Sequence, residues 1–180
     1  MLGFIKRNCS RDFKTATLRR LYTALVRPHV DYATVIWNTN NYHITNTDYV
    51  ECVQRRFVKL ICIKGGFEYH RSDYVDACST LNLTTLYKRR FITDMIFLYK
   101  IINCHQDSNL ISLLNFRVPS RNTRNTDTFV QCNGRINVFK NSCINRLQTF
   151  YNSNSFKHVD IFHLTLTNFK SALLNVINDL

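Results

Sequence analysis

The sequence predicts a mainly α-helical fold, and three observations support this prediction. Only four glycines and two prolines interrupt the 180 residues, whereas a many-stranded sheet needs frequent turns. Apolar residues recur at helical spacing over several long segments. Hydrophobic residues make up 45% of the chain, which is enough for a packed core. We expect a helical bundle over residues 1–116 and a smaller C-terminal extension over residues 117–180.

The first predicted helical region surrounds Pro28. This proline either ends one helix or begins the next at its first position, where its missing N–H costs nothing. Arg19 and Arg20 lie on the polar side of the first helix. The apolar stripe consists of Leu18, Leu21, Tyr22, Leu25, Val30, Ala33 and Trp37.

The second predicted helix follows Asp48, which forms a variant of the capping box with Glu51. Glycine tolerates the left-handed conformation at a helix C-terminus, so Gly65-Gly66 should end this helix. Its basic side chains lie largely off the apolar face. The predicted apolar face consists of Val50, Val53, Phe57, Leu60 and Ile61.

Several shorter elements surround one strong helix over Leu86–Ile102, which Thr84 or Thr85 should cap. A short helix over Asp73–Thr80 precedes it, and a short turn over Leu110–Phe116 follows it. Two final helices should be capped by Asn141 or Ser142 and by Thr165. Their apolar stripes consist of Ile144, Leu147 and Tyr151 in the first and Leu166, Phe169, Leu173 and Ile177 in the second.

One β-hairpin is predicted in the extension, over Asp127–Lys140. Asn133-Gly134 lies at its centre with β-prone residues on both sides, and this pair suits the positive φ angles of a two-residue hairpin turn. Such a turn would place Phe129 opposite Val138.

The charge balance favours an anionic partner. Lysine and arginine number 24 against 12 acidic residues, a formal charge of +12, which is typical of nucleic-acid-binding chains. The predicted partner is therefore nucleic acid. No apolar run is long enough for a membrane helix, and the N-terminal residues do not resemble a signal peptide. We therefore expect an intracellular protein, in the cytoplasm or the nucleus, with no membrane partner and with its seven cysteines reduced and mostly buried.

The candidate binding residues form two basic clusters, each beside an apolar helical stripe. The alternative for each cluster is an ordinary solvated helix face. Arg121 and Arg124 form a weaker third patch. Tyr32 and Trp37 are able to stack on bases, but their fit to the stripe favours core packing. The two clusters consist of Arg55, Arg56 and Lys59 and of Lys88, Arg89 and Arg90.

No catalytic or metal-binding constellation stands out. Cysteine pairs with zinc-site spacing are absent from the sequence, and no two acidic residues are adjacent. Asp73 and Asp76 are close in sequence, but we interpret them as part of a solvated face. Cys104-His105 is better explained as a helix end than as a catalytic pair.

An ordered series of segments resembles the C-terminal region of reverse transcriptases from jockey-like non-LTR retrotransposons. Each segment is weak alone, and the order of the set carries the resemblance across nearly the whole chain. The segments are LGFIKRN, LRRLYTALVRPHVDYATVIWN, VECVQRRFVKLI, LYKRRFITDMIFLYKIIN, FRVPSRNTRNTDTF, INRLQTFYN and LTNFKSAL.

The resemblance implies the thumb and tail of an RNA-directed DNA polymerase. The thumb would lie along an RNA or RNA–DNA duplex, and the missing palm and fingers would be its protein partners. The parent polymerase would use Mg²⁺, but no position here matches its paired aspartates, so the chain itself is expected to be non-catalytic and without a cofactor. Two alternatives are a protein-interaction module derived from the element and a decayed remnant without function.

Overall fold

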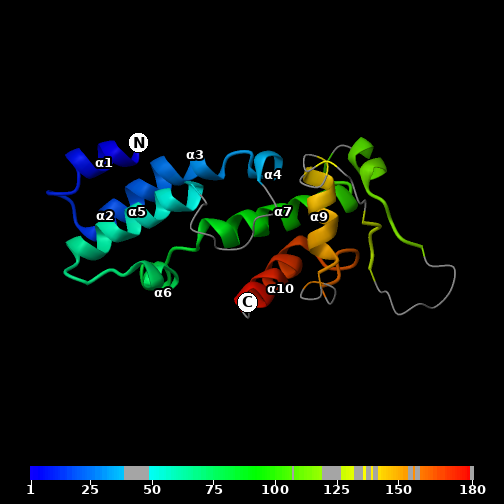
Figure 1. Cartoon of the computed structure of the whole chain (residues 1–180). Helices are drawn as coiled ribbons and strands as arrows, with labels where there is room; N and C mark the ends of the chain where they lie inside the picture. The colour runs from blue at the N-terminus through cyan, green and yellow to red at the C-terminus, as the bar shows by residue number, and fades with distance from the viewer. Residues whose placement is uncertain are drawn as a thin grey trace. The chain divides into compact units, whose positions relative to one another are not determined.

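The computed structural model describes residues 1–38, 49–106, 108–118, 127–131, 136, 139, 142–153, 156 and 159–178. Over these residues the chain is mainly helical, which confirms the predicted fold class (Figure 1). It forms two compact units, the first of Met1–Ala33 and His43–Arg89 and the second of Thr34–Tyr42 and Arg90–Leu180. One limit of this division lies between Arg89 and Arg90, within the helix Leu86–Ile102, and not at the predicted boundary between residues 116 and 117.

The first unit is a cluster of helices that packs around the middle of α5. α1 and α2 both contact α5, as does α6 (Figure 1). Its elements are α1 (Leu2–Asn8), α2 (Thr15–Leu21), a π-helical turn (Tyr22–Val26), α3 (Arg27–Asp31), α5 (Tyr49–Lys64), a 3₁₀ turn (Arg71–Asp73), α6 (Tyr74–Thr80) and the first turn of α7 (Leu86–Ile102). Its core cluster consists of Ile5, Leu18, Tyr22, Val26, Phe57, Val58, Ile61, Tyr74, Cys78 and Leu83.

Pro28 is the second residue of α3 and lies in its first turn, so it stands near the start of a helix as in the second predicted role, but one residue later than predicted. A proline ring inside a regular helix would clash with the carbonyl four residues earlier. Here the π-helical turn precedes the proline, and the backbone N–H of Arg27 donates to the carbonyl of Tyr22, five residues earlier. The wider turn lets the helical path continue up to the proline.

The wider turn also changes which residues face the core. Leu18, Tyr22 and Val26 are buried at intervals of four residues, whereas Leu25 is exposed. The predicted stripe is therefore wrong at Leu25, because a π turn holds more residues than the 3.6 of an α-helical turn.

Tyr32 and Trp37 do not pack in a core, which corrects the prediction made for them. Tyr32 is 80% exposed and Trp37 is 41% exposed. Ala33 has a φ of 52°, in the left-handed region, so the helical stripe does not run on from α3 into α4 (Thr34–Trp37). In α4 the buried residue is Thr34 and not Trp37.

α5 buries polar residues that the predicted stripe omits. Glu51 and Gln54 are buried together with Phe57, Val58 and Ile61, so the inner face is rotated by about one residue from the prediction. The amide of Gln54 donates to the Thr84 carbonyl at 2.9 Å and accepts from the Tyr22 hydroxyl at 3.1 Å, which satisfies this buried group.

The glycine pair ends α5 as predicted. Gly66 has a φ of 75°, and the N–H of Phe67 donates to the Cys62 carbonyl at 3.0 Å. These are the features of a Schellman motif. The predicted cap at Asp48 lies outside the described residues, and the Glu51 side chain instead accepts hydrogen bonds from the N-terminus of α7.

α7 has the predicted bounds, Leu86–Ile102, and Thr85 is its predicted cap. The Lys88 N–H donates to Thr85 Oγ1 at 3.3 Å. Beyond its C-terminus, Cys104 has a φ of 55° and the His105 N–H donates to the Lys100 carbonyl at 2.8 Å. Cys104-His105 therefore marks a helix end, as predicted.

The second unit is built from α4, most of α7, a 3₁₀ segment (Ser108–Leu113), α9 (Cys143–Tyr151) and α10 (Leu166–Asn178). α4 contacts α9. The predicted stripe of α10 is confirmed at Phe169, Leu173 and Ile177, which are all buried. The buried apolar residues of this unit are Phe91, Met95, Leu98, Tyr99, Ile101, Leu114, Phe129, Leu147, Tyr151, Phe156, Val159, Ile161, Phe169, Leu173 and Ile177.

Most of the predicted hairpin, including Asn133, Gly134 and Val138, lies outside the described residues, so that prediction stays untested there. Within the described part, Phe129 forms an antiparallel bridge with Phe116. Their ring centroids lie 5.3 Å apart. The β-prone segment around Phe129 therefore pairs with the residues that follow the 3₁₀ segment.

The cysteines of the described residues are free thiols, but only Cys78 is buried, so the prediction of mostly buried thiols is wrong. Burial raises the pKa of the Cys78 thiol, whereas Cys104 is exposed at the end of α7. Because the thiolate is the nucleophile, we expect iodoacetamide to alkylate Cys104 at least about tenfold faster than Cys78. Peptide mass spectrometry measures both rates. In urea the rates should converge, and equal rates in the native protein would contradict the structure.

Within the described residues, no helix combines the length and the hydropathy that a bilayer span requires.

Candidate nucleic-acid interface

α5 carries the first predicted cluster on the side away from the core of the first unit. Arg56 and Lys59 are exposed, and Arg55 is half-buried. The inner face of the helix is occupied by Phe57, Val58 and neighbouring buried residues. Helical geometry thus brings the three cations to one outer face, as the sequence predicts.

The three cations line one cleft of about 270 Å³, which we call the basic cleft. The segment after α5 adds Tyr69, and the 3₁₀ turn adds Arg71. None of the lining side chains is acidic, so the cleft concentrates positive charge at its wall. The basic cleft is lined by Cys52, Arg55, Arg56, Lys59, Tyr69 and Arg71.

Arg55 is held in place by an aromatic ring beneath it. Its guanidinium carbon lies 5.0 Å from the ring centroid of Tyr74. The Tyr74 hydroxyl donates to the buried carboxylate of Glu51. This chain of contacts fixes the guanidinium at the cleft wall, as cation–π contacts do.

Two buried donors at the cleft have no hydrogen-bond partner among the described residues. They are Nε of Arg55 and the hydroxyl of Tyr69. Burial raises the pKa of the Tyr69 hydroxyl, and the positive charges of Arg55 and Arg71 oppose that shift without overcoming it. Tyr69 therefore stays protonated at neutral pH. Buried donors without acceptors cost free energy, but these two atoms have almost no accessible surface, so they are not themselves contacts for a ligand in the cleft.

The second predicted cluster does not form one exposed surface. Arg89 donates through Nε and Nη2 to Oδ2 of Asp31, at 3.0 and 2.7 Å. Arg90 is only 7% exposed. Lys88 is half-buried. Arg89 is thus paired with a carboxylate and Arg90 is buried, so the second cluster is less open to a ligand than the first, and its assignment to phosphate contact stays a prediction.

The remaining sequence candidates add no site. Arg121 and Arg124 lie outside the described residues. Asp73 and Asp76 are both exposed, as predicted for a solvated face. Over the part of the chain that the structure describes, no three histidine, cysteine or acidic side chains are grouped to hold a metal ion.

Sequence reasoning missed Arg71 and Tyr69. Both follow the Gly65-Gly66 turn, and their distance from Arg55 in the sequence exceeds any helical spacing. The only sequence signal was the charge of Arg71, which is one of 24 basic residues. Their position depends on how the chain turns back after Gly66.

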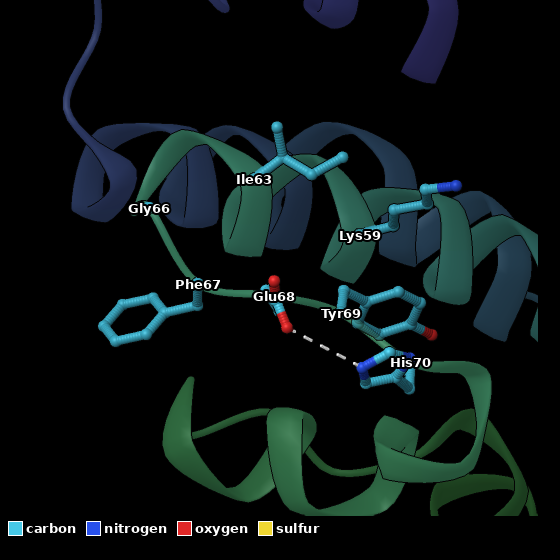
Figure 2. Close-up of a pocket in the computed structure, with 7 residues that line it drawn as sticks. All are labelled: Lys59, Ile63, Gly66, Phe67, Glu68, Tyr69 and His70. Atoms are coloured by element: carbon cyan, nitrogen blue, oxygen red, sulfur yellow. Dashed lines mark ion pairs between the residues drawn. The ribbon is translucent and has the colours of Figure 1, made fainter.

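A second cleft of about 420 Å³ adjoins the basic cleft, and we call it the aromatic cleft. Figure 2 shows Lys59 and Ile63 on α5 and the other lining residues on the segment that follows the helix. Nε2 of His70 lies 3.9 Å from Oε2 of Glu68. The two clefts share Lys59 and Tyr69. The aromatic cleft is lined by Lys59, Ile63, Gly66, Phe67, Glu68, Tyr69 and His70.

Comparisons with protein-family models, with curated proteins and with solved structures find no match to this chain. The resemblance to reverse transcriptases therefore depends on the sequence segments alone.

Proposed function

We propose that the first unit binds the sugar–phosphate backbone of an RNA or RNA–DNA duplex through the basic cleft. The observation that carries the proposal is the meeting of Arg55, Arg56, Lys59 and Arg71 in one cleft that no acidic side chain lines. Cations that neutralise phosphates release counterions, and this release supplies most of the sequence-independent affinity for nucleic acid.

The orientation of Arg55 on the ring of Tyr74 supports a phosphate ligand. Phosphate oxygens only accept hydrogen bonds, which suits the arginine and lysine side chains that line the basic cleft. A guanidinium oriented on an aromatic ring loses less conformational freedom when it binds. Backbone contacts of this kind position a nucleic acid without reading its sequence.

We further propose that the chain is a non-catalytic part of a non-LTR retrotransposon reverse transcriptase, corresponding to its thumb and tail. The ordered sequence segments support this assignment. In that case the palm and fingers of the parent would be protein partners, and the Mg²⁺ of polymerisation would belong to the palm. The proposal assigns no catalytic residue to this chain and an intracellular location to its parent.

The test is a salt titration of duplex binding with the Arg56→Ala, Lys59→Ala, Arg71→Ala triple variant. Arg56, Lys59 and Arg71 are exposed, so the substitutions should leave folding intact. We expect affinity for an RNA–DNA duplex to fall roughly tenfold or more at low salt. The slope of log affinity against log salt should flatten by up to about 0.9 per lost contact. Fluorescence anisotropy measures both.

A charge-matched control removes Arg7, Lys14 and Lys170, which are exposed and do not line the cleft. The control loses as much charge as the test variant. It should therefore keep most of the affinity if the contacts are local. If both variants lose affinity equally, the chain binds through its net charge alone and the cleft assignment fails.

A protein-interaction module is the second candidate. The exposure of large side chains such as Tyr32 and Tyr49 favours it, since such surfaces often meet a partner. The test is whether a protein partner stays associated after nuclease treatment. If the wild type and the triple variant both keep the partner, this candidate is favoured over nucleic-acid binding. A chain that shows no cooperative thermal transition would instead support a decayed remnant.

A further inference from the structure

The surface next to the basic cleft exposes two large apolar side chains. Phe67 is 71% exposed and Ile63 is 62% exposed. Both line the aromatic cleft, and Lys59 and Tyr69 belong to both clefts. A ligand that occupies the two clefts together would place an anionic group among the cations and an apolar group beside Phe67.

The ring of Phe67 is positioned by the backbone it covers. A Cβ atom added to Gly65 would lie 2.9 Å from Cδ2 of this ring, so the ring packs directly over the glycine. In Figure 2 the ring lies at the end of the cleft near Gly66, whereas Lys59, Tyr69 and His70 lie toward the other end. The apolar and the cationic parts of the cleft are thus separated.

We infer that the aromatic cleft holds one unpaired nucleobase on the ring of Phe67 while the adjoining phosphate occupies the basic cleft. A nucleotide combines an anion and a flat ring, and every base offers a π face to an aromatic side chain. This inference rests on the proposed function, and it narrows the ligand to a strand with at least one unpaired nucleotide. A fully paired duplex keeps its bases stacked inside and would use the basic cleft alone.

Charge complementarity selects a nucleotide over an apolar peptide as the occupant. The basic cleft contributes Arg55, Arg56 and Arg71 beside the shared Lys59, and the chain carries a formal charge of +12. Glu68 is the acidic group in the aromatic cleft, and His70 lies within 3.9 Å of its carboxylate. The Glu68 carboxylate can accept a hydrogen bond from the amino group of a base. A phosphate group of the ligand has no such donor.

The test compares two single strands of about ten nucleotides, within the usual site sizes of single-strand binders. One is an ordinary oligodeoxynucleotide, and the other has the same backbone without bases. The wild-type protein should bind the ordinary strand roughly five- to one-hundredfold more tightly, as expected for one stacked base. Phe67→Ala should remove that preference and leave binding to the abasic strand and to an RNA–DNA duplex unchanged.

Two matched variants separate stacking from folding. Phe4→Ala removes another exposed phenylalanine of the first unit and should keep the preference. Phe67→Trp should also keep it. Trp37 is the one tryptophan of the natural chain, so combining Phe67→Trp with Trp37→Phe leaves a single tryptophan, at position 67. The ordinary strand should quench the fluorescence of this tryptophan, and the abasic strand should not.

The outcomes distinguish this inference from the proposed function. Equal affinity of the wild type for both strands, or equal loss on both strands in Phe67→Ala, overturns the base site and leaves backbone binding standing. Failure of the wild type to bind the strands and the duplex overturns both proposals. A base preference lost only in Phe67→Ala supports the inference.

Discussion

Replacing Arg146 with methionine is expected to lower the free energy of unfolding of the second unit by about 3–5 kcal/mol. Arg146 and Asp94 are both fully buried, and Nε of Arg146 lies 3.2 Å from Oδ2 of Asp94. Arg146 also donates to the carbonyls of Val35 and Asn38. Methionine keeps much of the side chain's volume but leaves a buried carboxylate and two carbonyls without this donor.

Urea denaturation followed by circular dichroism measures the change. The double variant Arg146→Met, Asp94→Leu should recover much of the loss, because it removes the uncompensated charge as well. Lys170→Ala removes an exposed cation from the same unit and should change the free energy by less than about 0.5 kcal/mol. A loss below about 1 kcal/mol for Arg146→Met would show that the buried pair does not hold this core together.

Replacing Glu51 with alanine is expected to cost the first unit about 2–4 kcal/mol. Oε1 of Glu51 accepts from the Leu86 N–H at 3.2 Å, and Oε2 accepts from the Tyr87 N–H at 3.1 Å. The carboxylate is buried at the N-terminus of α7, where the helix dipole favours negative charge. The substitution removes the acceptor of these two donors and of the Tyr74 hydroxyl.

Thermal and urea unfolding of Glu51→Ala, compared with Glu68→Ala, test this prediction. Glu68 is exposed, so its loss should change stability by less than about 0.5 kcal/mol. Glu51→Gln keeps one acceptor oxygen and should fall between the wild type and Glu51→Ala. Equal stabilities of the two alanine variants would mean that water replaces the carboxylate at the start of α7.

The effect of Glu51 should reach the candidate interface. The Tyr74 hydroxyl donates to Glu51, and the ring of Tyr74 lies beneath the guanidinium of Arg55. A buried carboxylate thus supports a surface cation through one aromatic side chain. We interpret Glu51 as a positioning residue for the basic cleft, because it is buried and is linked to Arg55 only through Tyr74.

The helices that sequence reasoning placed best are those with strong local signals. α7 has the predicted bounds because Thr85 caps its start and apolar residues repeat along its whole length. The stop of α5 was predictable because glycine tolerates the φ of 75° at Gly66. These features depend on a few consecutive residues, so they can be recognised without knowing what the helix packs against.

The failures share a different cause. α5 buries Glu51 and Gln54 because partners from distant segments satisfy them, and no periodic apolar pattern includes a glutamate. Leu25 is exposed because the π-helical turn before Pro28 shifts the inner face. In each case the deviation depends on a contact or a backbone adjustment that composition and spacing do not contain.

The same distinction applies to the candidate interface. Arg55, Arg56 and Lys59 lie on one helix, so their shared outer face follows from helical spacing. Arg89 and Arg90 are also neighbours on one helix, so spacing alone does not distinguish them from Arg55 and Arg56, and only their contacts do. Arg89 reaches Asp31, and Arg90 is buried.

The sequence alone therefore determined the helical class, the limits of the helices with strong local signals and the strongly cationic character of the chain, because these depend on neighbouring residues and on composition. The tertiary structure decided which cations remain open to a ligand. It paired Arg89 with a carboxylate, buried Arg90 and joined Arg71 and Tyr69 to the cations of α5. Burial and pairing arise from contacts between residues far apart in the sequence, so only the folded chain reveals them.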